Sequence, residues 1–172
     1  MYLCSTGRRR VEGKRLEPIP RTHLSIVAGL LEVLEDYQGK VDVAKIADEL
    51  MLELDDILPA IEAAEILGFI KVDSGDLILT EKGREYIAGN SMERKKILNQ
   101  TLSRTSLFKW IIEQLKSRGN EMSKEELIAL LEEEMPDVDA ARMVKWIIEW
   151  GRHALLLRYD SDSQTIRLGE LA

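Results

Sequence analysis

Apolar residues recur at three- and four-residue steps along the first half of the chain, and this spacing predicts amphipathic helices. The first stripe consists of Leu24, Val27, Leu30, Leu31 and Leu34. Thr22 is the predicted N-cap of this helix, and Gln38-Gly39 ends it. A second stripe lies within residues 41–51, and a third, formed by Leu54, Ile57, Ile61, Ala64 and Leu67, lies within residues 53–68. Met51-Leu52-Glu53 is the predicted turn between these two helices.

Residues 69–80 change to a period of two around the turn Asp73-Ser74-Gly75-Asp76. Alternation on both sides of an Asp/Gly turn predicts a β-hairpin. Three short helices followed by a hairpin is the order of a winged helix, in which the hairpin is the wing.

The second half repeats this plan. Helical patterns cover residues 106–119, 123–135 and 138–151, Ser123 and Glu126 have the spacing of a capping box, and residues 154–168 read as strand, turn and strand. Leu30 aligns with Ile111 and Gly68 with Gly151, at offsets of 81 and 83 residues, which indicates two copies of one unit. Residues 92–104 are a predicted connecting helix.

The predicted fold is therefore α+β and mainly helical, with tandem winged-helix-like units. Residues 1–22 form a basic flexible arm or linker, residues 23–91 the first unit, and residues 92–172 the connecting helix with the second unit. Pro18 and Pro20 support an extended arm, because proline disfavours helix at and before its own position.

Composition narrows the class of protein. Aromatic residues make up 5% of the chain, and the single cysteine, Cys4, excludes a disulfide framework. The two histidines are far apart in sequence, so we expect no metal centre and no cofactor. The sequence has no apolar run of membrane-spanning length and no signal-peptide core, which predicts a cytoplasmic protein without direct membrane insertion.

Catalytic signatures are lacking as well, so the chain is not expected to be an enzyme. Residues 7–15, GRRRVEGKR, resemble a phosphate-binding loop, but five residues separate the glycines and no Ser or Thr follows Lys14. The adjacent carboxylates Asp55 and Asp56 do not face each other on a helix, and they suit a helix N-terminus instead.

Charge is divided unevenly along the chain. Residues 1–23 hold six basic and two acidic residues, which gives this segment a net charge of +4. The whole chain has a net charge of −7, so residues 24–172 together have a net charge of −11. The third predicted helix contains carboxylates and no cation, and such a helix repels DNA. We therefore interpret it as a face for a protein partner, formed by Glu53, Asp55, Asp56, Glu62 and Glu65.

The alternative is a DNA-binding transcriptional regulator that uses the second unit. There Arg142, Lys145 and Arg152 balance the carboxylates of Asp137, Asp139 and Glu149. The arm would add phosphate contacts from its own cations, which are Arg8, Arg9, Arg10, Lys14 and Arg15. Nucleic acid is the less favoured partner on this count of charges.

Three stretches, DDILPAIEAAEILGF (55–69), LTEKGREYI (79–87) and WGR (150–152), carry a resemblance to a known family. Over about residues 20–169 the chain resembles the AAA-associated C-terminal domain family. Members of that family follow the ATP-binding cassette of nitrate/sulfonate/bicarbonate-type ABC transporters. This chain has no Walker A loop, signature motif or Walker B strand, so we expect a free-standing subunit or a detached piece.

The resemblance implies a non-catalytic regulatory or protein-interaction module that associates with an ABC-transporter ATP-binding subunit. It assigns no catalytic residue. The implied location is cytoplasmic, with attachment to the inner membrane only through a transporter complex. A second copy of the chain is a further expected partner.

Overall fold

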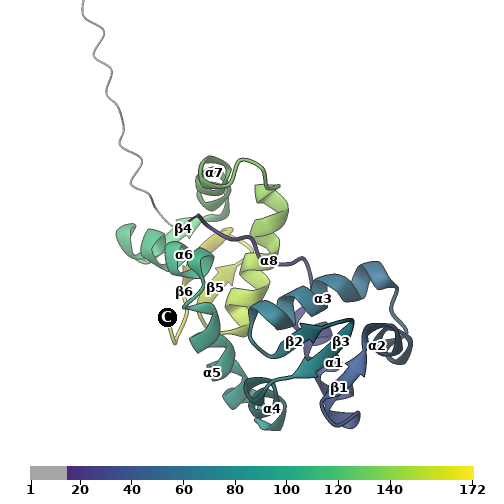
Figure 1. Ribbon diagram of the computed structural model, residues 1–172. Helices are drawn as coiled ribbons and strands as arrows, with labels where there is room; N and C mark the ends of the chain where they lie inside the picture. The colour runs from purple at the N-terminus through teal and green to yellow at the C-terminus, as the bar shows by residue number, and fades with distance from the viewer. Residues whose placement is uncertain (1–14) are drawn as a thin grey trace, which may run out of the picture.

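The protein was described from a computed structural model that places residues 15–172. The first part contains the elements α1 (Leu24–Asp36), β1 (Lys40–Asp42), α2 (Val43–Leu50), α3 (Leu54–Ile66), β2 (Ile70–Asp73) and β3 (Asp76–Leu79). Two helices follow, α4 (Glu81–Ala88) and α5 (Ser91–Leu102). The last part contains α6 (Ser106–Ser117), β4 (Glu121–Ser123), α7 (Lys124–Glu134), α8 (Ala140–His153), β5 (Leu157–Asp160) and β6 (Thr165–Leu168). The predicted mainly helical α+β class is confirmed (Figure 1).

The same order of elements thus occurs twice, as helix, strand, helix, helix and hairpin. We call residues 24–79 unit one and residues 106–168 unit two. Each unit holds a three-stranded antiparallel sheet, with strand order β1-β3-β2 in one and β4-β6-β5 in the other. The first strand of each sheet was not predicted, because three residues are too few to show alternation. The buried centres of these strands, Val41 and Met122, pair with Leu77 and Ile166.

The order of elements repeats, but one of the two predicted residue alignments between the halves is wrong. Leu34 and Leu115, 81 residues apart, both accept a backbone bond from the turn after their helix, which supports the offset of Leu30 and Ile111. Gly68 instead matches Leu155, since both follow the third helix of their unit with left-handed backbones, at φ +75° and +56°. The offset increases to 87 because α7 and its following loop are longer than α2 and its turn.

The predicted capping box of Ser123 and Glu126 is present at the start of α7. The predicted N-cap Thr22 is wrong, because His23 occupies that position of α1. Thr22 is buried instead, and its carbonyl oxygen accepts a hydrogen bond of 3.0 Å from the Trp150 indole N–H. This bond joins the segment before α1 to the third helix of unit two.

The end of the predicted arm is packed against the body. Figure 1 shows the purple segment before α1 passing across unit two on its way to α1. Ile19 is buried in the hydrophobic core, and the Glu17 backbone N–H donates to the Ser106 hydroxyl at 3.1 Å. Residues 16–22 therefore belong to the folded body. Arm residues 1–14, including Cys4, lie outside the described residues.

Within the LTEKGREYI stretch (79–87), local packing and hydrogen bonding explain why threonine and glycine occupy positions 80 and 83. Thr80 caps α4, and its hydroxyl accepts the Gly83 N–H at 3.1 Å and donates to the Gly68 carbonyl at 2.6 Å. A Cβ at Gly83 would overlap the Phe69 carbonyl oxygen and the Leu79 side chain. Glycine at this position therefore lets α4 lie directly on the end of the hairpin.

Two glycine substitutions should change stability in opposite directions. Gly83→Ala is expected to lower the free energy of unfolding by about 1–3 kcal/mol, because the added methyl group overpacks against backbone. Gly29→Ala, inside α1, should raise it by about 0.5–1 kcal/mol, since its Cβ would meet only Leu50 at an ordinary 3.8 Å. Urea unfolding of both variants measures this difference. A stabilised Gly83→Ala variant would contradict the packing described here.

Candidate interaction face and its counterpart

The predicted acidic residues lie at the start of α3 and along its length. Glu53, Asp55, Asp56, Glu62 and Glu65 are all exposed. Asp55 and Asp56 lie in the first turn, where carboxylates interact favourably with the helix dipole. Among residues 15–172, no ion pair involves any of these five side chains. Their charge therefore remains free for a partner.

Exposed apolar side chains also lie on α3, and the sequence pattern did not reveal them. Leu54 was predicted in the buried stripe, but 53% of it is exposed. Leu58 and Ile66 follow at four- and eight-residue steps, so with Leu54 and Glu62 they form one stripe along the helix. Met51, which ends α2 with left-handed backbone, is 90% exposed beside them. We call these four apolar and five acidic residues the α3 face.

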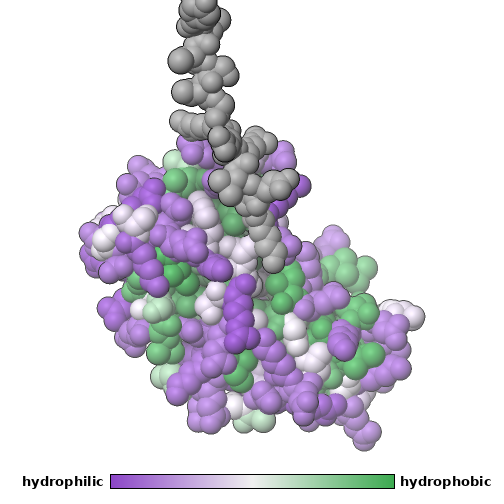
Figure 2. All heavy atoms as spheres, turned by 60° about the vertical axis from the view of Figure 1, so that its left-hand side comes forward, coloured by the Kyte–Doolittle hydropathy of each residue, from purple (hydrophilic) through white to green (hydrophobic). Residues whose placement is uncertain are grey.

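A cluster of exposed large apolar residues is typical of a binding surface. Figure 2 shows green apolar atoms exposed among purple hydrophilic ones on the face of the molecule that it draws. The signal in the sequence was the position of Leu58 and Ile66, which lie outside the stripe that carries Ile57, Ile61 and Ala64. Apolar residues off the core stripe of an amphipathic helix indicate a second covered face.

The equivalent helix of unit two, α8, has the opposite charge. The three predicted cations of this unit do not each form an ion pair with one of the three predicted carboxylates. Arg142 Nε lies 3.4 Å from Asp139 Oδ2, while Glu149 Oε1 lies 2.7 Å from Nδ1 of His23. Within the described residues Lys145 and Arg152 have no carboxylate partner, and both line a cavity beside α8.

The remaining cations that we predicted for nucleic-acid binding are those of the arm, and the structure does not place them with Lys145 and Arg152. Arg8, Arg9, Arg10 and Lys14 lie outside the described residues. Arg15 lies 3.8 Å from Asp137, but both side chains are at least 85% exposed. Such an exposed pair contributes little to stability.

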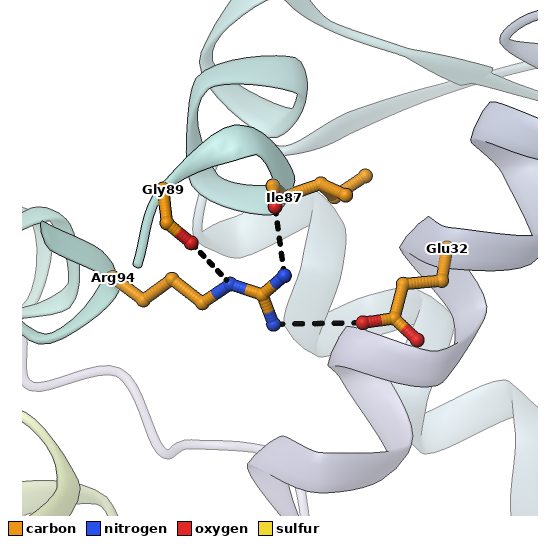
Figure 3. A network of polar contacts seen from close by, with 4 residues as sticks. All are labelled: Glu32, Ile87, Gly89 and Arg94. Atoms are coloured by element: carbon orange, nitrogen blue, oxygen red, sulfur yellow. Dashed lines mark hydrogen bonds and ion pairs between the residues drawn. The ribbon is translucent and has the colours of Figure 1, made fainter. Parts of the chain in front are cut away.

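Helix α5 joins the two units, and Arg94 makes the contact with unit one (Figure 3). Its guanidinium group donates to the carbonyl oxygens of Ile87 and Gly89 at 2.7 and 3.1 Å. It also lies 3.5 Å from Glu32 of α1 and 5.4 Å from the ring centre of Tyr86. Arg94 thus holds the end of α4, the start of α5 and the side of α1 in one arrangement.

Asn99, on the same helix, makes the contact with unit two. Its side-chain amide donates to the carbonyl oxygens of Ala154 and Leu171 at 2.9 and 3.2 Å. Ala154 ends α8, and Leu171 lies near the C-terminus. Because Arg94 and Asn99 share one helix, α5 fixes the end of α8 relative to α1.

The displaced pKa values in the described residues have structural causes. Burial raises the pKa of the Tyr86 hydroxyl, and Arg94 partly opposes the rise. Burial, followed by the charge of Arg104, lowers the pKa of Lys82. Hydrogen bonds from Ser163 and Asp162 lower the pKa of Asp160 in the second hairpin. Asp160 therefore accepts the turn N–H groups as a carboxylate at neutral pH.

Residues 15–172 hold neither a membrane-spanning helix nor a cluster of metal ligands. No helix there has the length and apolar character that crossing a bilayer requires. No group of three or more His, Cys, Asp or Glu side chains in that part of the chain is arranged to hold a metal ion.

Comparison with known proteins gave one match. A model of the C-terminal AAA-associated domain family matches residues 44–160, which include the first hairpin and end with β5, the first strand of the second hairpin. The match begins in α2 and covers α3, α5 and α8. Searches of curated proteins and of solved structures found no match to the chain.

The contacts of Arg94 predict a graded loss of stability. Arg94→Ala should lower the free energy of unfolding by about 2–3 kcal/mol, because charged hydrogen bonds to two carbonyl groups are lost. Glu32→Gln, which removes only the half-exposed ion pair, should change it by less than about 0.5 kcal/mol. Thermal and urea unfolding test both variants. Equal losses in the two would show that the ion pair, not the carbonyl bonds, holds α5.

Proposed function

The chain belongs to the C-terminal AAA-associated domain family, and on that premise we propose that it is a non-catalytic protein-interaction module. The proposed partner is the ATP-binding subunit of an ABC importer of the nitrate/sulfonate/bicarbonate type. The proposed location is cytoplasmic, with contact to the inner membrane only through that transporter complex. The α3 face is the single observation that carries the proposal.

We infer that each unit is a winged helix, from its order of elements and its terminal hairpin. In that fold the third helix is the element that reads DNA in the major groove. In unit one this helix presents three exposed apolar residues and carboxylates without a cation. Phosphate groups would be repelled there, whereas a protein surface with apolar and basic residues would be attracted.

The partner surface follows from this chemistry. Leu54, Leu58 and Ile66 would form the apolar centre, since the centre of an interface is depleted in charge. The carboxylates beside them would meet Lys or Arg side chains of the partner. A stable contact of this kind covers about 800 Å² on each side. The module would then regulate the subunit by binding one of its conformations more tightly than another.

The first test removes the apolar centre of the α3 face. Leu58→Ser/Ile66→Ser is expected to weaken binding to the ATP-binding subunit at least tenfold, as loss of interface anchors does. Met92→Ser on α5 is the matched control, because Met92 is also 51% exposed but lies outside the α3 face. Biolayer interferometry with the full chain measures both. Equal weakening by the control variant, or no binding by the unchanged chain, would refute the proposal.

The second test reverses the charge. Glu62→Lys/Glu65→Lys should slow association with the same subunit and reduce its dependence on salt, since steering by opposite charges is lost. Melting temperature should change little, because both positions are exposed.

Nanomolar, sequence-selective DNA binding by the unchanged chain at physiological salt would favour the regulator alternative. ATP hydrolysis by the pure chain would contradict a non-catalytic role.

A further inference from the structure

A cavity of about 610 Å³ lies beside α8, on the side of α5 and of unit two's sheet. Its walls carry four basic side chains, Lys95 from α5, Lys124 from the start of α7, and Lys145 and Arg152 from α8. The ring of Tyr159 in β5 and the apolar side chain of Ile148 complete much of the lining. Cations from three helices therefore converge on one concave site.

Opposite charge is scarce in this cavity. Glu149 is the one carboxylate in its wall, and it is bound to His23 at 2.7 Å. None of the four basic groups forms an ion pair within residues 15–172. The whole chain has a net charge of −7, so the clustering does not follow from a general excess of cations. Converging cations without counter-charges raise the potential of a cleft and attract anions into it.

A second cavity, of about 310 Å³, shares Lys95 and His153 with the first. Its walls include the apolar side chains of Leu24, Ala28 and Leu98. A ligand with an anionic group and an uncharged part would thus find a basic compartment and a partly apolar one side by side. The first cavity alone has the size of ordinary small-molecule sites, about 300–1,000 Å³.

We propose that the first cavity binds a phosphate-bearing small molecule, with Lys95, Lys124, Lys145 and Arg152 as the phosphate ligands. Arginine and lysine form short, strong hydrogen bonds to phosphate oxygens, and arginine binds them in pairs. A small molecule fits better than a nucleic acid duplex, because the cations line a hollow and the equivalent helix of unit one is acidic. The proposal stands whether or not the α3 face binds an ATPase.

The test is isothermal titration calorimetry of the full chain with inorganic pyrophosphate and with ADP at 150 mM NaCl. The unchanged chain should bind at least one of them with a dissociation constant below about 1 mM. Lys145→Ala/Arg152→Ala should weaken that binding at least tenfold, since two charged hydrogen-bond donors are lost. Melting temperatures confirm that the variants fold.

Matched controls come from the same helices. Arg142→Ala changes an α8 cation that pairs with Asp139 outside the cavity, and Lys96→Ala changes the exposed neighbour of Lys95. Both should bind like the unchanged chain, whereas Lys95→Ala should bind more weakly. Absence of binding to both probes, or equal weakening by the controls, would overturn the proposal. So would a short DNA duplex that binds more tightly than both probes and loses affinity in the same variants.

Discussion

The position of α5 between the two units is the constraint on which the arrangement of the surface depends. Arg94 bonds it to the carbonyl groups that end α4, and Asn99 bonds it to the end of α8. Between them Lys95 lines both cavities. A rotation of α5 would break these bonds and would separate Lys95 from the cations of α8. The bond from the Trp150 indole N–H to the Thr22 carbonyl oxygen adds a second connection, between the segment before α1 and α8.

The two units share a topology but present their third helices differently. Helix α3 has no cation and exposes leucine and isoleucine, while α8 carries Arg142, Lys145 and Arg152. Both helices bury an apolar side against their own sheet and neighbours, so the fold constrains only that side. The outward side is free to differ. A duplicated framework can therefore hold a protein-binding surface on one copy and an anion-binding hollow beside the other.

The helices and hairpins were predictable from the sequence because their apolar spacing is local. The stripe from Leu24 to Leu34 and the Asp73–Asp76 turn both appear as predicted. The first strands were not, because β1 and β4 exist only through pairing with a distant strand. Thr22 looked like a cap, but the Trp150 bond 128 residues away decides its place.

The candidate sites were predictable only in part, for the same reason. The acidic residues of α3 were visible as a run without cations. Exposure of Leu54 and Leu58 depends on which side of the helix the sheet covers, and sequence spacing assigned Leu54 to the wrong side. Lys95 and Lys124 are distant in sequence from Lys145, so their meeting in one cavity is a consequence of tertiary structure.

The most direct test asks whether the α3 face binds the ATP-binding subunit while the cavity beside α8 binds phosphate. It locates both binding sites on the same labelled protein. Amide chemical shifts of the isotope-labelled chain are recorded with the ATP-binding subunit and, separately, with pyrophosphate. The subunit should perturb residues 51–66, and pyrophosphate should perturb residues 145–153 together with Lys95 and Lys124, if each ligand binds where we propose. Perturbation of residues 145–153 by the subunit, with residues 51–66 unchanged, would contradict the proposal for the α3 face.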